Sequence, residues 1–472
     1  MKRKRIVLHN LVMENYAAEG KSLAKVDGKV IFVENTIPGD EVDVLVRKNK
    51  KDWSEGIAIH YHKYSDLRIE PFCQHFGVCG GCQWQMLPYQ QQLQYKHQQV
   101  ADNLKRIGKV DLPEILPIIA ADQTTRYRNK MEYTFANKRF LLPEEIKNPD
   151  ISTEDNVAGF HARGFFDKVV PIIECHLQPE PTNYIRLAVL DYAKQHNLSH
   201  YDIRNHTGFL RNLIVRMATT GEIMVNLVTG YEDKKTLTRL LEDISGKFPE
   251  ITTLLYTVNP KYNDSLYDLE PQVFSGKGFI LEKLSTGSAG EYFEFRISPK
   301  SFFQTNTKQG EKLYQVVRDF AELRGHETVY DLYCGTGSIG IFVSKIAGKI
   351  IGVETVEDAV EDAKENAALN NLQNASFFAG DVTEICNDVF FAQNGKPDVI
   401  ITDPPRVGMH DKLVKKLLEI AAPVIVYVSC NPATQARDLA LLNEKYVVTK
   451  IQPVDMFPHT LHIENVVQLK LR

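Results

Sequence analysis

The sequence predicts an α/β protein whose C-terminal part is a doubly wound, mainly parallel sheet. From Glu327 onward, apolar strand segments alternate with helical segments, as in TVYDLYCG, KIIGVE, PDVIITDPP and PVIVYVSC. The chain has 472 residues, more than one hydrophobic core usually supports, so two or three domains are expected. A sheet of this kind binds its ligand beyond the carboxyl ends of its strands.

Residues 1–65 are predicted to form a small OB-like β-barrel. Strand-like alternation occurs in VLHNLVME, KVIFVEN and EVDVLVRKN, and Pro38-Gly39-Asp40 is a turn signal between two of these segments. Barrels of this class include modules that bind RNA, although the fold alone does not fix a function.

Residues 66–290 are predicted to form a mixed α+β domain, and residues 291–472 to form the doubly wound domain. The central region contains three clustered cysteines and a Gln-rich helical stretch from Tyr89 to Lys105. It also contains a strand pair, 213–218 with 222–228, joined at Thr219-Thr220-Gly221.

Charge and composition limit the classes of partner. The formal net charge is -4, so any RNA-binding surface must be local. Three segments combine basic and aromatic residues or lie at the basic start of the chain, although each is also ordinary for a solvated face: Lys2–Arg5; Arg47 to Trp53; and Arg126, Arg128 and Lys130 with Tyr127 and Tyr133. Apolar runs are too short for a membrane span and the start lacks a signal peptide, so we expect a cytoplasmic protein without a membrane partner.

A glycine-rich loop follows the first strand of the doubly wound region. It reads DLYCGTGSIG and places Gly335 and Gly337 where a backbone turns tightly and approaches a cofactor. Glu354 ends the next strand, where a carboxylate accepts hydrogen bonds from ribose hydroxyls. These features predict a nucleoside site, but they do not distinguish NAD from S-adenosylmethionine.

Two motifs at later strand ends favour methyl transfer. Asp403 lies in DPPR and Cys430 lies in SCNP, both at the rim where a substrate must bind. Hydride transfer has no need of a cysteine there. Methylation of a weakly nucleophilic carbon does need one, because a thiolate that adds to the neighbouring atom of an unsaturated ring makes that carbon nucleophilic.

Four motifs follow one another along the chain in the order SPKSFFQTN, DPPR, SCNP and HIENV. Together they resemble the RNA uridine-5-methyltransferases of the TrmA and RlmD group. The resemblance covers most of the chain, including a first domain similar to the family's TRAM domain. It implies a Rossmann-like methyltransferase domain that makes 5-methyluridine. It further implies Cys430 as the nucleophile and Glu464 as the base that removes the C5 proton.

The same resemblance implies the residues that contact S-adenosylmethionine: Gln304, Tyr333, Glu354, Asp381 and Asp403, with Gly335 and Gly337 in the loop. Ser338 stands where many members have Asn. The target base must leave its stack to reach Cys430. Its candidate stacking partners, each also an ordinary core residue, are Tyr127, Tyr133, Phe302 and Phe303.

Cys73, Cys79 and Cys82 form a separate cysteine group. Seven cysteines in a chain of this length argue against a disulfide framework. Structural zinc sites usually show two CxxC knuckles and this group has one, although a mixed zinc site with His75 or His176 remains open. Among the remaining thiols, Cys175 is the best fourth ligand.

The spacing C-x5-C-x2-C with a distant cysteine matches the [4Fe-4S] site of the RlmD-like members. Radical enzymes typically use C-x3-C-x2-C instead, so we expect a cluster without a redox duty. The cluster favours 23S rRNA as substrate, since bacterial tRNA enzymes of the family typically lack these cysteines. We expect a monomer that binds no DNA. The alternatives are a tRNA methyltransferase or, from another class, an iron–sulfur oxidoreductase that uses a dinucleotide.

Overall fold

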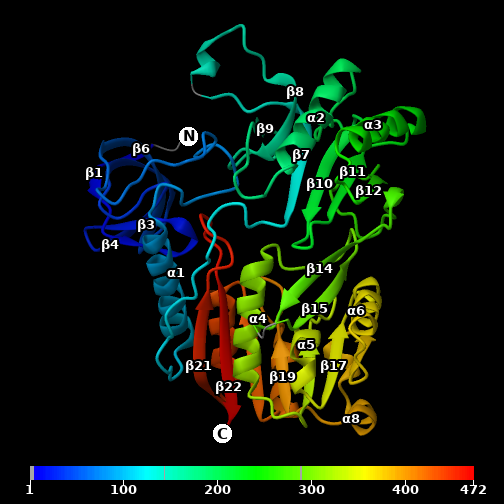
Figure 1. Ribbon diagram of the computed structural model, residues 1–472. Coiled ribbons are helices and arrows are strands. Elements are labelled where there is room, and N and C mark those ends of the chain that lie inside the picture. Colours follow the sequence, from blue (N-terminus) through cyan, green and yellow to red (C-terminus); the bar gives the residue numbers. More distant parts are fainter. Residues whose placement is uncertain (1–4, 143, 288–289) are drawn as a thin grey trace.

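The computed structural model describes residues 5–142, 144–287 and 290–472. Most of the basic start Lys2–Arg5 lies outside these residues. The described chain contains a six-stranded N-terminal sheet, a seven-stranded central sheet, a two-stranded hairpin and a seven-stranded C-terminal sheet. Figure 1 shows the central sheet above the C-terminal sheet, with the N-terminal sheet at their side.

The N-terminal sheet has the strand order β1-β5-β6-β4-β3-β2. Its strands contain the segments predicted from alternation, and Val33, Val42 and Val44 lie in its core. Closure into a barrel stays a prediction. The strands are β1 (Ile6–Val12), β2 (Asn15–Tyr16), β3 (Ser22–Val26), β4 (Lys29–Glu34), β5 (Glu41–Asn49) and β6 (Trp53–Lys63), and a 3-10 turn covers Ala18–Gly20.

The central sheet has the order β13-β12-β11-β10-β7-β8-β9, and α2 and α3 contribute to its core. The predicted hairpin is present, because β10 and β11 pair antiparallel with Leu213 opposite Leu227. The elements are β7 (Lys130–Lys138), β8 (Glu154–His161), β9 (Val169–Pro171), α2 (Thr182–Gln195), β10 (Leu210–Met217), β11 (Ile223–Thr229), α3 (Lys234–Lys247), β12 (Thr253–Val258) and β13 (Gln272–Gly276), with a 3-10 turn at Glu145–Lys147.

The C-terminal sheet has the order β18-β17-β16-β19-β20-β22-β21. Strands β16 to β20 are parallel, whereas β22 runs antiparallel to β20 and β21. This confirms the doubly wound prediction. The strands are β16 (Thr328–Leu332), β17 (Lys349–Glu354), β18 (Ala375–Ala379), β19 (Val399–Thr402), β20 (Val424–Ser429), β21 (Tyr446–Val454) and β22 (Glu464–Leu471).

Helices on both faces cover this sheet, and they form two apolar cores with it. The helices are α4 (Thr307–Ala321), α5 (Ser338–Val343), α6 (Glu357–Leu369), α7 (Val382–Ile385), α8 (Asp388–Asn394), α9 (Asp411–Ile420) and α10 (Pro432–Leu442), with a 3-10 turn at Ser344–Ile346. Among the described helices, none combines the length and apolar character that crossing a bilayer requires.

The Gln-rich helix belongs to the C-terminal core by its packing. It forms α1 (Tyr89–Asn103), followed by a π-helical turn at Leu104–Gly108. Val100 and Leu104 pack in one core with strands of the C-terminal sheet. The chain then runs along β21, where Ile115 and Ile119 form parallel bridges to Ile451 and Val454. Figure 1 shows α1 beside β21 and away from the central sheet.

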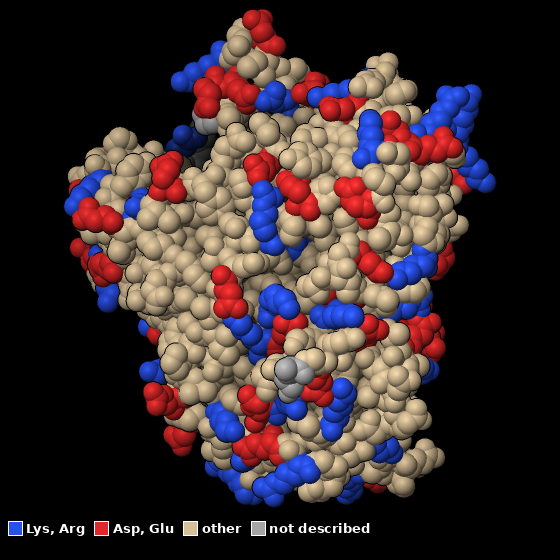
Figure 2. Space-filling view, in the orientation of Figure 1, with Lys and Arg blue, Asp and Glu red and all other residues tan. Residues whose placement is uncertain are grey.

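The hairpin of β14 (Ile280–Ser285) and β15 (Tyr292–Ile297) crosses the predicted boundary at residue 290. Phe293 and Phe295 lie in the core that contains α4 and α5, so the hairpin packs with the C-terminal sheet. The surface shown in Figure 2 carries Lys and Arg interspersed with Asp and Glu, consistent with the mild net charge.

Candidate active site

The glycine loop after β16 is held in a conformation that few residues other than glycine adopt. Tyr333, Gly335 and Gly337 have φ of 60°, 52° and 76°. A Cβ at Gly337 would lie 2.9 Å from the Phe377 ring, so the third of these positions accepts only glycine without movement of a neighbour. The predicted tight turn is therefore present.

Glu354 is tied directly to this loop. Its Oε2 accepts a hydrogen bond of 3.1 Å from the amide of Gly335, and its Oε1 accepts from the amides of Thr355 and Val356 at 2.8 and 3.0 Å. These bonds fix the carboxylate at the end of β17, beside the loop. The predicted ribose ligand and the predicted cofactor loop thus meet in space.

A cavity of about 90 Å³ lies at this strand edge. Its lining includes three of the predicted cofactor residues, Tyr333, Glu354 and Asp381, together with His410 and Lys412. The hydroxyl and amide of Thr383 lower the pKa of Asp381, which caps α7. A carboxylate beside this cavity suits a hydrogen-bond donor such as an adenine amino group.

Gln304 lies just before α4, next to the central region of the chain. Its side chain is buried, and its backbone oxygen accepts a 2.8 Å hydrogen bond from Asn129 of the central region. Ser338, at the position where many family members have Asn, shares a 2.8 Å hydrogen bond with the Tyr314 hydroxyl. The hydroxyl is therefore used within the protein at the start of α5.

Cys430 and Glu464 come together at the ends of two neighbouring strands. Ser429 pairs with Asn465 in the antiparallel ladder of β20 and β22, so Cys430 and Glu464 follow at the same end of the ladder. Asp403 directly follows β19, the strand on the other side of β20. The fold thus gathers a thiol and two carboxyl groups on one rim.

The three groups influence each other strongly, because Glu464 is buried and Asp403 and Cys430 are half-buried. Burial, with the neighbouring carboxyls of Glu464 and Asp403, raises the pKa of Cys430 to about 12. Burial raises the pKa of Asp403 to about 7, and burial together with Asp403 raises the pKa of Glu464 well above its ordinary value. The three groups therefore keep protons at a higher pH than the same groups would in water.

The loops that carry DPPR and SCNP are bonded to each other. The backbone oxygen of Arg406 accepts hydrogen bonds from Asn431 Nδ2 at 3.1 Å and from the Thr434 hydroxyl at 3.3 Å. The Arg406 guanidinium lies 3.5 Å from His462 Nδ1 and favours the thiolate form of Cys430. Sequence reasoning assigned no role to Arg406 or His462, although both stand inside the quoted motifs.

Asp331 is a further buried acid that the sequence analysis left without a role. Its Oδ2 accepts a 2.8 Å hydrogen bond from Gly340, whereas Oδ1 is buried without a partner. Burial, with the Asp403 and Glu354 carboxyls, raises the pKa of Asp331 to about 7. Asp331 is the first residue of DLYCGTGSIG, and this position beside the glycine loop could have identified it from the sequence.

The stacking candidates differ in exposure. Phe302 is 68% exposed, whereas Tyr127, Tyr133 and Phe303 are buried. The Tyr127 hydroxyl donates to the backbone oxygen of Pro458, and Phe303 packs in the core below β15. Phe302 is therefore the candidate whose ring is free to meet a base.

Cys73, Cys79, Cys82 and Cys175 line one cavity of about 450 Å³. Burial raises the pKa of each of the four thiols, and neighbouring cysteines raise the pKa of Cys79, Cys82 and Cys175 further, which reflects their proximity. Within the described chain, no three His, Cys, Asp or Glu side chains converge as ligands of a single metal ion. A four-iron cluster instead takes one thiolate at each iron, so its ligands stand around a larger volume.

The lining of the cysteine cavity also includes residues from other segments. These are Arg128, which lies just before β7, and Thr460 and His462, which lie shortly before Glu464 in the chain. Four thiols around a cavity of this size are a donor set that fits a [4Fe-4S] group.

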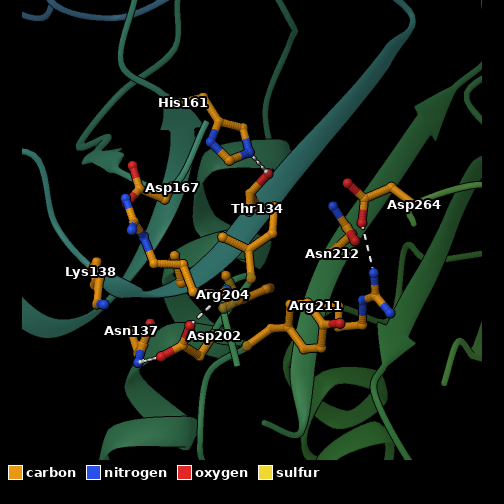
Figure 3. A pocket seen from close by; sticks show the side chains of 14 residues that line it. Thr134, Asn137, Lys138, His161, Asp167, Asp202, Arg204, Arg211, Asn212 and Asp264 are labelled. Atoms are coloured by element: carbon orange, nitrogen blue, oxygen red, sulfur yellow. Dashed lines mark hydrogen bonds and ion pairs between the residues drawn. The ribbon is translucent and has the colours of Figure 1, made fainter. Parts of the chain in front are cut away.

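A further polar cavity lies between β7, β8 and β10 of the central sheet, as shown in Figure 3. Its volume is about 20 Å³, which accommodates a single water. The charged side chains around it bond one another, as in Arg211 with Asp264 at 2.8 Å and Asn137 with Asp202 at 3.0 Å. Its size and internal pairing indicate a structural role.

The sequence is similar to a known protein family and to several bacterial proteins. The family model described as tRNA (Uracil-5-)-methyltransferase matches residues 270–472. An uncharacterized RNA methyltransferase of Bacteroides thetaiotaomicron is 51% identical, over 97% of this chain and 100% of that protein. One of Porphyromonas gingivalis is 47% identical, over 96% of this chain and 98% of that protein.

A solved structure is similar over the whole length. The Pyrococcus abyssi tRNA (uracil-54, C5)-methyltransferase in complex with S-adenosyl-L-homocysteine aligns with a TM-score of 0.73 and 28% identity, covering 99% of this chain and 100% of that one. These similarities are to methyltransferases, so they argue against the alternative of a dinucleotide-dependent oxidoreductase. The chain belongs to the S-adenosylmethionine-dependent RNA uracil-5-methyltransferase family.

Proposed function

We propose that the protein methylates uracil C5 in 23S rRNA through a covalent adduct between Cys430 and C6. The observation that carries this proposal is the meeting of Cys430, Glu464 and Asp403 at one buried rim, beyond the strand ends that also carry the cofactor loop. A nucleophile, a proton acceptor and a nucleoside site would then lie along one edge of the C-terminal sheet, as the reaction requires.

Each step follows from these groups. The Cys430 thiolate adds to C6, and the electron pair that develops at C5 attacks the methyl group of S-adenosylmethionine, whose sulfonium leaves as the neutral thioether. C5 now carries a methyl group and a proton. Glu464 takes that proton, the C5–C6 double bond re-forms, and the C6–S bond breaks to return the thiolate.

The environment of Glu464 suits the role of base. Its carboxyl is buried, and burial with the Asp403 charge raises its pKa. A carboxylate with a raised pKa is a stronger base than an exposed one, and general bases work best when their pKa approaches the working pH. Asp403, with its pKa raised to about 7, is the second carboxyl on the rim and is proposed to help orient the uracil.

We infer that Gln304, Tyr333, Glu354, Asp381 and Asp403, with Gly335 and Gly337, bind S-adenosylmethionine. The cavity shared by Tyr333, Glu354 and Asp381 supports the adenosine end of this assignment. Gln304, near the central region, is proposed for the methionine end.

Cys73, Cys79, Cys82 and Cys175 are proposed to hold a [4Fe-4S] cluster. The support is the shared cavity and the all-thiolate donor set. When bound, the cluster would join residues 73–87, which we call the cysteine segment, to Cys175, and it would leave catalysis to Cys430 and Glu464.

The choice between rRNA and tRNA rests on two opposing observations. The four cysteines favour ribosomal RNA, since bacterial tRNA enzymes of the family typically lack them. The structural similarity to an archaeal tRNA (uracil-54, C5)-methyltransferase favours tRNA. We therefore keep tRNA as the second candidate.

The test uses RNA in which uridine is replaced by 5-fluorouridine. Fluorine cannot leave as a proton, so the adduct should persist on a denaturing gel when S-adenosylmethionine is present. Cys430→Ala should give no adduct, whereas Cys386→Ala, which changes a buried cysteine of another core, should retain it. Adduct with 23S rRNA but not tRNA supports the first candidate, the reverse supports the second, and no adduct with either contradicts the mechanism.

A further inference from the structure

The connection between β21 and β22 is the segment that presents Glu464. It covers residues 455–463, and we call it the base loop. Val454 pairs with Glu464 across the β21–β22 ladder, so the two ends of the base loop are held side by side. The position of Glu464 therefore depends on what holds this loop.

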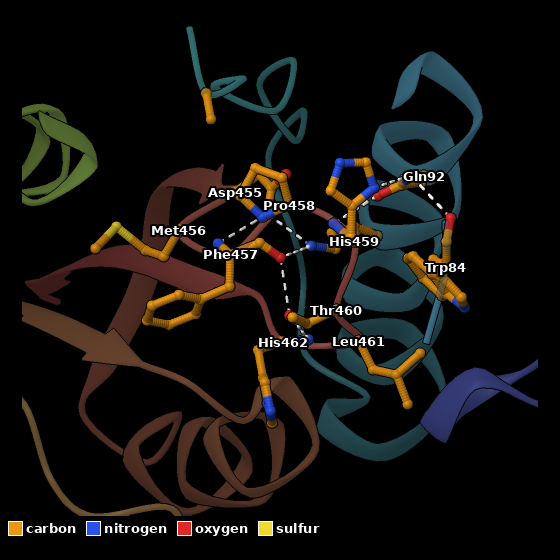
Figure 4. Close-up of polar contacts among 12 residues, drawn as sticks. Trp84, Gln92, Asp455, Met456, Phe457, Pro458, His459, Thr460, Leu461 and His462 are labelled. Carbon is orange, nitrogen blue, oxygen red and sulfur yellow. Dashed lines mark hydrogen bonds and ion pairs between the residues drawn. The ribbon is translucent and has the colours of Figure 1, made fainter. Parts of the chain in front are cut away.

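Gln92 of α1 is fully buried and bonds the base loop with both ends of its amide. Its Oε1 accepts a 2.9 Å hydrogen bond from the amide of His459, and its Nε2 lies 3.2 Å from His459 Nδ1. The same Nε2 donates to the backbone oxygens of Trp84 and Leu87 at 3.0 and 2.9 Å. Figure 4 shows Gln92 between His459 and Trp84, so one side chain joins α1, the cysteine segment and the base loop.

Lys96, one helical turn further along α1, makes a second connection. Its Nζ lies 2.6 Å from Asp455 Oδ1, and both side chains are fully buried. Nζ also donates to the backbone oxygen of Phe457 at 3.0 Å, and the Tyr89 hydroxyl donates to Asp455 at 2.8 Å. A buried ion pair rarely stabilises a protein more than packed apolar side chains would, but it fixes one arrangement of the groups that it joins.

The backbone of the cysteine segment adds to this attachment, as do Tyr127, Asn306 and Gln309, whose side chains donate to backbone oxygens of the base loop. The amides of Gln83 and Trp84 donate to the His459 oxygen at 2.8 and 3.0 Å. His459 has a φ of 64°, a conformation that non-glycine residues adopt at a cost of about 1 kcal/mol or more. The surrounding bonds therefore hold the base loop in a shape that it would not keep alone.

Cys430 does not depend on the base loop in the same way. It follows β20, which lies inside the sheet between β19 and β22. Glu464 is the first residue of β22 and comes directly after the loop. A loosened base loop should therefore displace the base more than the nucleophile.

We propose that Gln92 and Lys96 of α1 are positioning residues for Glu464, and that they set the rate of proton removal from C5 rather than the rate of methyl transfer. The inference rests on the proposed role of Glu464 as the base. It assigns to a helix outside the C-terminal sheet a selective effect on the last step of the reaction.

The experiment measures the two steps separately by rapid quenching. Methyl transfer is followed as labelled methyl in the covalent complex, and release as free methylated RNA. Gln92→Met removes four hydrogen bonds at similar side-chain length, and Lys96→Met combined with Asp455→Leu removes the ion pair without leaving a lone buried charge. Gln94→Met, at an exposed position of the same helix, is the matched control.

We expect release to slow by about tenfold or more in both variants while methyl transfer changes by less than about threefold, so that the methylated adduct accumulates. Equal slowing of both steps, or release at the wild-type rate, would overturn the inference. Should one variant fail to fold, the other decides.

Glu464→Gln, measured in the same experiment, distinguishes a wrong positioning role for α1 from a wrong assignment of the base. If it accumulates adduct but the α1 variants do not, the positioning role alone is wrong. If Glu464→Gln itself releases product at the wild-type rate, the proposed base is wrong and the positioning role fails with it.

Discussion

The Glu464 carboxyl and the Cys430 thiol lie at the same end of the β20–β22 ladder, and the carboxyl adds to the effect of burial in raising the thiol's pKa. In the ligand-free protein, Cys430 is therefore protonated at neutral pH. A positive charge beside Cys430, such as the sulfonium of the cofactor, would favour the thiolate that the proposed mechanism needs.

Replacing Glu464 by Gln should leave methyl transfer largely intact and slow product release by about 100-fold or more, since a general base typically contributes that much. The expected readout is a methylated RNA that remains bound to Cys430 on a denaturing gel. Glu444→Gln, at an exposed position, is the control. Release at the wild-type rate would assign the proton acceptor to another group.

The four cysteines of the cavity should bind iron and sulfide in anaerobically purified protein, with broad visible absorbance and about four irons per chain. Cys82→Ser and Cys175→Ser should each lose colour and iron, because each removes one of the four proposed attachments. Cys386→Ser changes a thiol outside the cavity and should keep both. Stoichiometric zinc without colour would contradict the cluster.

Phe302→Ala should weaken RNA binding by about 1–3 kcal/mol, because an exposed ring loses its stacking with a base. Binding of S-adenosylmethionine, measured by calorimetry without RNA, should stay unchanged. Tyr262→Ala removes another highly exposed ring, in the central region, and should have no comparable effect. Equal RNA affinities of the Phe302 variant and the wild type would exclude stacking at this position.

Asp331 should make the ligand-free protein less stable as the pH rises. Its folded pKa of about 7 exceeds the value near 3.9 of an unfolded chain, so the folded state holds the proton more tightly. The contribution to stability is fully present below about pH 4 and is lost as the pH rises to about 7.

Asp331→Asn keeps the size of the side chain and removes this titration. The Tm of the variant relative to wild type should therefore be higher at pH 8 than at pH 5. The exposed Asp191→Asn should show no such trend. A constant difference between the two pH values would show that Asp331 does not keep its proton in the folded state.

The C-terminal fold was predictable because its signals are local. Strand segments such as PVIVYVSC read as buried parallel strands, and the glycines of the cofactor loop mark a turn that the φ values then display. The same periodicity predicted α1 correctly, but not the surface on which it packs. That depends on apolar contacts between residues far apart in the sequence, such as Leu104 with the residues of the C-terminal core.

For the site, the sequence predicted which residues end the strands but not how they interact. That Cys430 and Glu464 adjoin follows from the antiparallel return of β22, a register that no local pattern encodes. Asp331, Arg406 and His462 were missed because their environment, rather than their spacing, distinguishes them. The assigned roles of the catalytic and cofactor residues, and the domain limits at 65 and 290, stay predictions.

The packing of α1 against β21 has a consequence for how the protein is divided. The catalytic unit draws on two separated stretches of chain, 89–119 and 280–471, and the central sheet is inserted between them. A fragment that starts at residue 291 would lose the helix that fastens the base loop, and so would not be an autonomous enzyme.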